Sequence, residues 1–160
     1  MAEFTHFKKD GSAVMVDVHE KPDTYRAASA TGTIQVSPEV FAAVRDHTAK
    51  KGDVLGVARL AGIMGAKKNA ELIPLCHIVP LTNCEVTFTT DENTNSITAV
   101  CTTSCVGKTG VEMEALTGVQ VALLTIYDMC KAIDKRMVMS DIHLEEKTGG
   151  KSGDFRFEEK

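Results

Sequence analysis

The apolar stretch VQVALLTIYDMC at residues 119–130 restricts the fold of this chain more than any other segment. It lies within a longer pattern, residues 111–135, that predicts a helix. Between residues 119 and 130 this helix is apolar on nearly every side, so a sheet or a partner subunit has to cover it. Its most apolar part, residues 119–127, is too short to span a bilayer, which takes about 20 apolar residues. We therefore expect a helix buried in protein, and no membrane partner.

The net charge and the N-terminal sequence narrow the class of function. The 160 residues include 22 acidic side chains and 18 Lys or Arg, which gives a net charge of −4. Binding to a phosphate backbone needs a basic footprint, so we expect no nucleic acid partner. The sequence MAEFTHFKKDG at the N-terminus lacks the apolar core of a signal peptide, and we expect a cytoplasmic protein.

The cysteines argue against a disulfide framework and against a structural zinc site. They stand at positions 76, 84, 101, 105 and 130, an odd number without a C-x-x-C pair. Such a pattern is typical of reduced thiols that fill small buried spaces. We expect no metal site.

Alternation and capping signals predict the remaining elements. Ser37, Pro38 and Glu39 are typical of a helix start, and Gly52 is suited to end that helix. Residues 84–105 alternate between apolar and polar on both sides of a polar DENTN tip, which predicts a hairpin. The expected set is a strand at 26–36, helices at 39–51 and 54–69, an extended connection at 71–81, the hairpin, the helix at 111–135 and a strand at 137–146.

With the two early helices counted as one layer, this order is β-α-β-β-α-β. It predicts an α+β ferredoxin-like sandwich, in which an antiparallel sheet has helices packed on one face. The length favours one domain over residues 1–160. Within it we expect an N-terminal arm at 1–24 and a tail rich in glycine and lysine at 147–160.

Three glycines at positions 56, 62 and 65 stand inside the second predicted helix. Each costs about 1 kcal/mol relative to alanine in a helix interior. They indicate that another backbone or a ligand comes close, and tight packing is the simpler interpretation.

The segment GKTGVEME at residues 107–114 is not a nucleotide phosphate loop. A phosphate loop needs a glycine five positions before the Gly-Lys, and Thr102 stands there. The segment can still present backbone N–H groups to an anion at the start of a helix. Glu112 and Glu114 suit a helix N-terminus equally well, so the sequence leaves a structural and a functional role open for them.

Several lysines stand near predicted helix ends, where cations are stabilising even without a functional role. Their recurrence suggests that cations gather at one place, which suits a polyphosphate or another anionic small molecule. Asp128 and Lys131 share a helix face in an otherwise apolar segment, and they form either a surface ion pair or a proton-transfer unit. Cys76 and His77 are further candidates for a nucleophile and for an acid or base.

Taken together, these segments resemble the cyclic pyranopterin monophosphate synthases, which act second in molybdenum cofactor biosynthesis. The resemblance covers nearly the whole chain in order. It departs at Ile78, where the family usually has proline. The matching stretches are MVDV (15–18), KGDV (51–54), ARLAGI (58–63), IPLCH (73–77), GKTGVEMEAL (107–116), IYDMCKA (126–132) and KTGGKSGDF (147–155).

The resemblance implies a lyase that acts on a small molecule, (8S)-3′,8-cyclo-7,8-dihydroguanosine 5′-triphosphate. The substrate is rearranged to cyclic pyranopterin monophosphate with release of diphosphate, and no cofactor is needed. It also implies a homohexamer, a trimer of dimers, with active sites shared across a subunit interface.

The resemblance also implies the site residues. Asp128, Lys131 and Lys51 would be catalytic, with the first two as a general acid/base pair. Glu112 or Glu114 would accept the two neighbouring N–H groups of the guanine-derived ring, and cations would bind the triphosphate. The substrate contacts carried over in this way are Leu75, Cys76, His77, Glu112, Met113, Glu114, Lys67, Lys147, Arg26 and Asp17.

Two other functions remain for comparison. A non-catalytic module of the same fold would bind a nucleotide at the helix start and return it unchanged. Binding of RNA on the sheet face fits poorly, because Phe88 is the one aromatic residue in the predicted hairpin and the net charge is negative.

Overall fold

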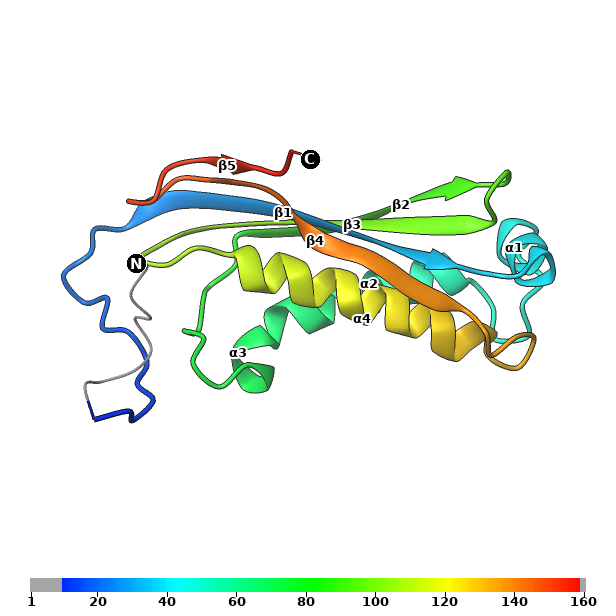
Figure 1. Cartoon of the computed structure of the whole chain (residues 1–160), viewed down its shortest axis with the longest axis horizontal. Helices are drawn as coiled ribbons and strands as arrows, with labels where there is room; N and C mark the ends of the chain where they lie inside the picture. Colours follow the sequence, from blue (N-terminus) through cyan, green and yellow to red (C-terminus); the bar gives the residue numbers. More distant parts are fainter. Residues whose placement is uncertain (1–9, 159–160) are drawn as a thin grey trace.

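A computed structural model describes residues 10–158 of the chain. Within this part, five antiparallel strands form one sheet in the order β2-β3-β1-β4-β5. Helices α2 and α4 lie side by side under one face of the sheet (Figure 1). The predicted α+β ferredoxin-like sandwich is confirmed. The strands are β1 Thr24–Gln35, β2 Asn83–Asp91, β3 Ser96–Gly107, β4 Val138–Thr148 and β5 Phe155–Arg156.

The helices are α1 Pro38–Arg45, α2 Val54–Lys67, α3 Asn69–Leu72 and α4 Glu112–Cys130. The predicted start of the first helix is confirmed, because Ser37 accepts a hydrogen bond from the backbone of Val40, and Asp53 caps α2 in the same way through the backbone of Gly56. The prediction that Gly52 ends the first helix is wrong, since the C-cap of α1 is Asp46. The single turn of α3 falls where the sequence indicated the end of the second helix and an extended connection. It breaks away from α2 at Lys68.

Two predicted helices end earlier than expected. The first stops at Arg45 and not at residue 51, because its buried side chains end at Val44 and the residues after it are mostly exposed and polar. The last stops at Cys130 and not at residue 135, since the residues that follow are largely exposed and bury no further apolar surface. Lys51 therefore lies in a loop and not on a helix end.

The core lies between α4 and the helix-facing side of the sheet. Val119, Leu123 and Ile126 of α4 are fully buried, and Ile34 of β1 and Ile97 of β3 are buried with them. Covering of the apolar helix by the sheet is thus confirmed. No helix among residues 10–158 has the length and apolar character needed to cross a membrane.

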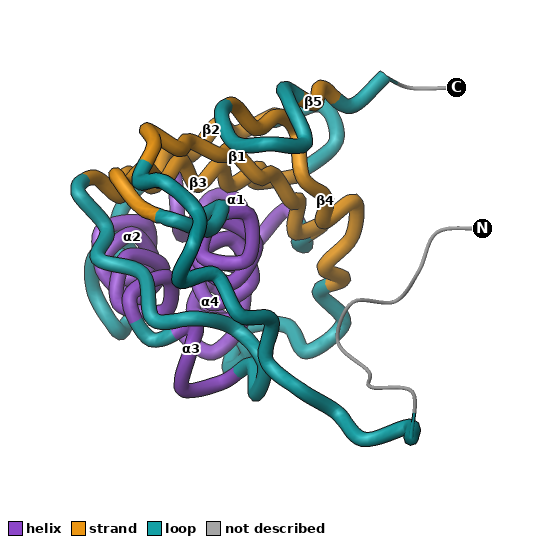
Figure 2. The backbone as a smooth tube through the Cα atoms, turned by 90° about the vertical axis from the view of Figure 1, so that its left-hand side faces the viewer, coloured by secondary structure: helices purple, strands orange, loops and turns teal. Residues whose placement is uncertain are grey.

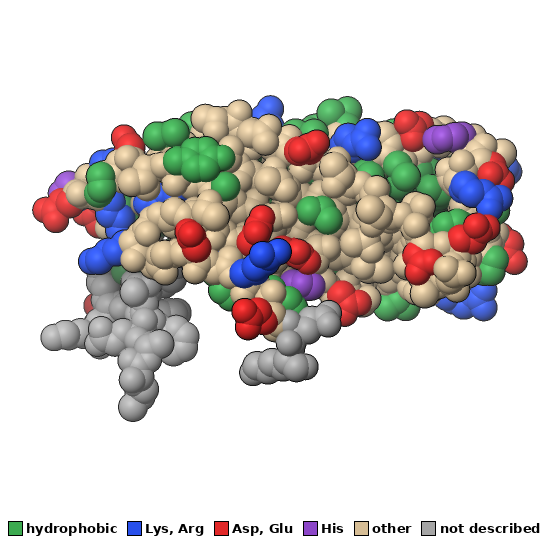
Figure 3. Space-filling view, turned by 90° about the horizontal axis from the view of Figure 1, so that it is seen from above, with side chains coloured by type: hydrophobic (Ala, Val, Ile, Leu, Met, Phe, Trp, Pro, Cys, Tyr) green, Lys and Arg blue, Asp and Glu red, His purple; other side chains and the backbone are tan. Residues whose placement is uncertain are grey.

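The opposite face of the sheet is polar but carries few charges. Hydroxyl side chains of β1 and β3 bond across the strands, as between Thr33 and Thr98 at 2.9 Å. Figure 3 views the molecule from above this face, and uncharged side chains and backbone cover much of its area.

The ends of the chain were expected to be an arm and a tail. Residues 1–9 of the arm and residues 159–160 of the tail lie outside the described residues. In the tail segment, β4 continues to Thr148, and β5 pairs Phe155 with Lys147. The KTGGKSGDF segment therefore contains the end of β4, the turn and the first residue of β5 in a short hairpin.

Close approach at a glycine of α2 is confirmed. A Cβ atom added at Gly62 would lie 2.9 Å from the backbone carbonyl oxygen of Gly118 in α4 and 3.1 Å from Val86. Because the oxygen belongs to a rigid helix backbone, the two helices would have to separate to make room.

Replacing Gly62 with alanine is expected to lower the free energy of unfolding by about 1–2 kcal/mol, even though alanine favours the helix by about 1 kcal/mol. Thermal and urea unfolding measure the change. Gly107→Ala is the matched control, since its added methyl group meets the sulfur of Cys105 at an ordinary 3.6 Å. A Gly62→Ala protein as stable as the parent would show that close packing of α2 on α4 is unimportant.

Candidate active site

The loops at one end of the sheet enclose a cavity beside the start of α4. Figure 2 looks onto this end, where the loops gather around α3 and α4. The cavity has a volume of about 160 Å³. It brings together five residues that the resemblance implied, with Val79, Thr109 and Gly110 completing its wall; the five are Leu75, Cys76, His77, Met113 and Glu114.

Glu114 is the buried acidic group of this cavity, with 4% of its surface exposed. Burial raises the pKa of Glu114, and a hydrogen bond from the side chain of Asn69 acts in the opposite direction. That bond joins Asn69 Nδ2 to Glu114 Oε1 at 2.9 Å. Residues 107–114 thus supply both a helix start and an acidic wall to the cavity.

The described part of the N-terminal arm, from residue 10 onward, crosses this end of the molecule and contacts His77. The ring Nε2 of His77 lies 2.7 Å from the backbone oxygen of Val16. Asp17, the next residue, is exposed and bonds to His19 through both the backbone and the ring. These bonds, first that from the backbone of His19, lower the pKa of Asp17. Asp17 is therefore next in sequence to a residue that contacts the cavity wall, but Asp17 itself does not line the cavity.

A second pocket of about 380 Å³ adjoins the first, because Thr109 and Gly110 line both. It is strongly cationic: among the described residues, five basic side chains line it against the single carboxylate of Glu112. Arg26 and Lys147 were predicted as substrate contacts, and the other three were not. The basic residues are Lys21, Arg26, Lys108, Lys147 and Lys151.

Arg26 carries unused hydrogen-bonding capacity in this pocket. Its Nε is buried and has no partner among residues 10–158. Its Nη2 donates to the backbone oxygen of Lys108 over a long 3.4 Å. A buried donor without a partner costs free energy, and an anion in the pocket would relieve it.

The β4–β5 hairpin forms one wall of the cationic pocket. Gly149 and Gly150 both have positive φ angles, of 86° and 85°, which glycine adopts without strain. A side chain at Gly150 would overlap the guanidinium of Arg26. Lys147 donates to Ser152 at 2.6 Å and lies 3.4 Å from Glu112. The turn thus fixes the position of Lys147 relative to Arg26.

The three residues expected to be catalytic meet at the other end of α4. Asp128 Oδ1 lies 2.7 Å from Lys131 Nζ, and Asp128 Oδ2 lies 2.9 Å from Lys51 Nζ. The hydrogen bond from Lys131, together with that from Lys51, lowers the pKa of Asp128 to about 2. The same contact raises the pKa of Lys131. At neutral pH this cluster holds one carboxylate between two ammonium groups.

This cluster and the cavity are far apart within one chain. Fourteen positions of α4 separate Glu114 from Asp128, which at about 1.5 Å per residue is about 21 Å along the helix axis. One chain therefore does not bring the predicted catalytic lysines to Lys147, so the expected gathering of cations is not found within one chain.

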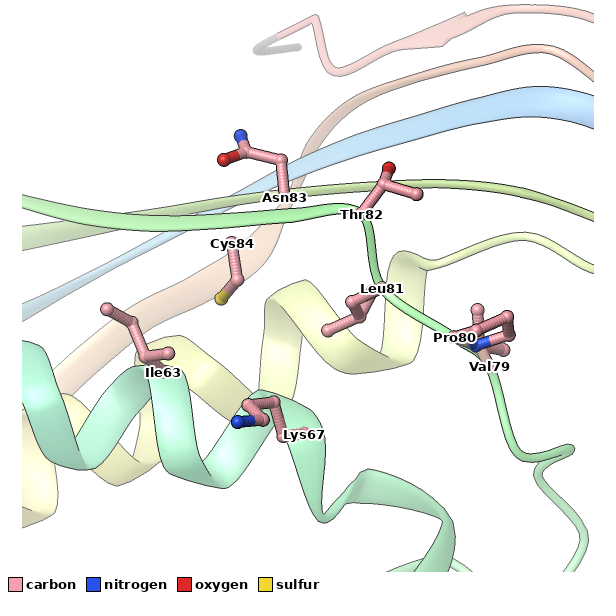
Figure 4. Close-up of a pocket in the computed structure, with 8 residues that line it drawn as sticks. All are labelled: Ile63, Lys67, Val79, Pro80, Leu81, Thr82, Asn83 and Cys84. Atoms are coloured by element: carbon pink, nitrogen blue, oxygen red, sulfur yellow. The ribbon is translucent and has the colours of Figure 1, made fainter.

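Lys67 lies at the end of α2, in a separate pocket of about 410 Å³. Figure 4 shows it with Ile63 and Leu81 below the start of β2. Cys84 lines the same pocket, and a hydrogen bond from Cys101, aided by the charge of Lys67, lowers the pKa of the Cys84 thiol. Val79 lines this pocket as well as the cavity of Glu114.

Lys21, Lys108 and Lys151 are the site residues that the sequence did not single out. Lys108 and Lys151 stand inside GKTGVEMEAL and KTGGKSGDF, so the signal was present in those motifs. Lys21 lies in the arm, outside every motif that matched the family, so nothing in the sequence marked it as a site residue. In the described part of the chain, no group of three His, Cys, Asp or Glu residues is placed to hold a metal ion.

Comparison with known proteins agrees with the resemblance seen in the sequence. The model of the MoaC family matches residues 15–150. The cyclic pyranopterin monophosphate synthase of Clostridium perfringens (strain SM101 / Type A) is 56% identical over 155 residues, which cover 97% of this chain and 98% of that protein. The enzyme of the same name from Clostridium botulinum (strain Alaska E43 / Type E3) is 57% identical over 153 residues, 96% of each chain.

Proposed function

The chain belongs to the MoaC family, and we propose that it catalyses the reaction for which its relatives are named, the synthesis of cyclic pyranopterin monophosphate in molybdenum cofactor biosynthesis. The substrate is (8S)-3′,8-cyclo-7,8-dihydroguanosine 5′-triphosphate, and diphosphate is released. The enzyme is a lyase.

One observation carries the assignment of the substrate site: a small cavity with a buried carboxylate opens beside a pocket lined by five basic side chains. A ring with neighbouring N–H donors fits the first, and a chain of phosphates fits the second. Glu114 is better suited than Glu112 to bind the ring, because Glu112 lies beside Lys147 in the cationic pocket. Glu114 instead lines the cavity.

The catalytic cluster comes from a second copy of the chain in this proposal. The separation of about 21 Å along α4 supports it, since a site that uses Glu114 and Asp128 together needs both ends of the helix. A symmetric pair of chains would then form two equivalent sites. We place such pairs in a homohexamer, a trimer of dimers, in the cytoplasm.

The charges of the cluster give Lys131 and Asp128 different roles in proton transfer. Asp128 raises the pKa of Lys131, which keeps Lys131 protonated at neutral pH but makes it a weaker acid, so proton donation during ring opening needs this contact to loosen when the substrate binds. Asp128, with a pKa of about 2, remains a carboxylate that orients Lys131 and Lys51. Release of diphosphate depends on positioning and charge stabilisation by the cationic pocket.

Incubation with the cyclised guanosine triphosphate tests the function directly. Mass spectrometry should show its conversion to the cyclic monophosphate and an equal amount of diphosphate. A protein that binds the nucleotide and returns it unchanged would instead be a sensor of the same fold.

Replacing Lys151 with alanine is expected to lower kcat/KM about tenfold, mainly by raising KM, because one charged contact to the phosphates is lost. Lys108→Ala should act in the same direction. Steady-state kinetics at two salt concentrations measure the effect, which should weaken as salt rises. Arg45→Ala is the control, since this exposed cation pairs with Asp46 and Glu92 away from the pocket. Unchanged KM values in both lysine variants would remove the phosphates from this pocket.

A further inference from the structure

A buried polar network connects α3 to the candidate site. Asn69 begins the single turn of α3, which lies below the start of α4 (Figure 1). The residue is only 1% exposed. The amide Nδ2 donates to Glu114 Oε1 at 2.9 Å, and Thr117 Oγ1 donates to the amide oxygen at 2.8 Å.

The hydroxyl of Thr117 gives this network a direction. Because it donates to Oδ1 of Asn69, it fixes the amide with its NH₂ group toward Glu114. Without that hydroxyl, a flipped amide would present its oxygen to the carboxylate and repel it. Thr117 and Glu114 stand three positions apart on α4, so the same helix holds both ends of the network.

We propose that Asn69 is a positioning residue, which donates to Oε1 of Glu114 and fixes the carboxylate so that the remaining lone pairs of its two oxygens are left for the ligand in the cavity. This inference rests on the proposed function, in which Glu114 accepts hydrogen bonds from the substrate ring. The NH₂ group of Asn69 also stabilises the ionised carboxyl, the form that accepts two N–H donors.

Other titratable groups around Glu114 come from three elements. Glu112 lies on the same helix and Cys105 on β3, while Cys76 and His77 face the cavity from the loop after α3. Of these, the charge of Glu112 disfavours ionisation of Glu114. The backbone N–H of Glu114 and the side chain of Asn69 are thus the neutral donors that oppose both burial and Glu112, and Asn69 is the one that comes from another element.

The decisive variant is Asn69→Leu, which keeps a branched side chain of similar size and removes the donor. The acid limb of kcat/KM should move to higher pH by about one unit, because one hydrogen bond to a charged group is lost. Thr117→Val should shift the limb in the same direction by less. Thr125→Val is the matched control, since its hydroxyl bonds to the backbone of Val121 in the same helix.

A second background separates positioning from general stability. In Glu114→Ala, the further replacement of Asn69 should change kcat/KM by less than about twofold. An equal loss in both backgrounds, or a loss in Asn69→Leu without a shift of the acid limb, overturns the positioning role. A Glu114→Ala enzyme with unchanged kcat/KM overturns the role of Glu114 in the proposed function as well. If Asn69→Leu fails to fold, the pH profile of Thr117→Val decides alone.

Discussion

Replacing Lys131 with alanine is expected to reduce kcat by about 10²–10⁴-fold, the range typical for loss of a positioned general acid. The ammonium group of Lys131 lies 2.7 Å from Asp128, and this contact keeps it protonated. Because the cluster is exposed and lies at the end of α4, its loss should leave the core intact. Turnover of the cyclised nucleotide measures the effect, and circular dichroism and size-exclusion chromatography test the fold and the assembly.

Asp128→Asn should also abolish turnover, since it removes the charge that orients Lys131 and Lys51. Lys135→Ala is the control: it removes a cation from the same end of the molecule, where the backbone oxygen of Lys135 accepts a bond from Tyr127. Product formation at the parent rate in both Lys131→Ala and Asp128→Asn would contradict the catalytic assignment.

Mixing two inactive variants should restore activity if each site is built from two chains. Arg26→Ala damages the cationic pocket, Lys131→Ala damages the cluster, and each alone should leave less than about 1% of the parent activity. When the two chains assemble at random in equal amounts, about one site in four receives an intact half from each chain. We therefore expect about a quarter of the parent activity, a rise of about 25-fold or more over either variant.

Co-expression with two different tags provides the mixed assemblies. Arg26→Ala mixed with Lys147→Ala is the control, because both residues line one pocket of one chain and no site escapes damage. Mixed assemblies of Arg26→Ala and Lys131→Ala that remain inactive would argue that all site residues come from one chain.

The fold was predictable from the sequence because its strongest signals are local. The apolar pattern of residues 119–130 required a covering sheet, and the alternation of residues 84–105 gave the hairpin. The ends of α1 and α4 were wrong by several residues, since their sequence patterns do not show where buried surface stops. The four residues of α3 are too few to show a pattern of their own, and Asn69 at its start contacts Glu114 and Thr117 of α4, which lie more than 40 positions away.

The candidate site was predictable only in part. The motifs placed Leu75, His77 and Glu114 in one group, and the structure brings these together in the cavity. The contact between Lys51 and Asp128 joins positions 77 apart, so no local spacing could reveal it. Lys21 joins the cationic pocket because the arm crosses it. The role of Asn69 depends on how its buried side-chain amide is oriented. Residues distant in the sequence set that orientation, so no local pattern predicts it.

Because α4 is a continuous helix, it fixes the distance between Glu114 and Asp128 in the proposed assembly. In that proposed assembly, the 19 residues of α4 would carry the acidic wall of one site at the first turn and the lysine-bound carboxylate of another site at the last. One inserted residue would rotate one end by about 100° and lengthen the helix by about 1.5 Å, so neither end would then meet its partner correctly. The interior of this helix therefore tolerates exchange of side chains far better than any change of length.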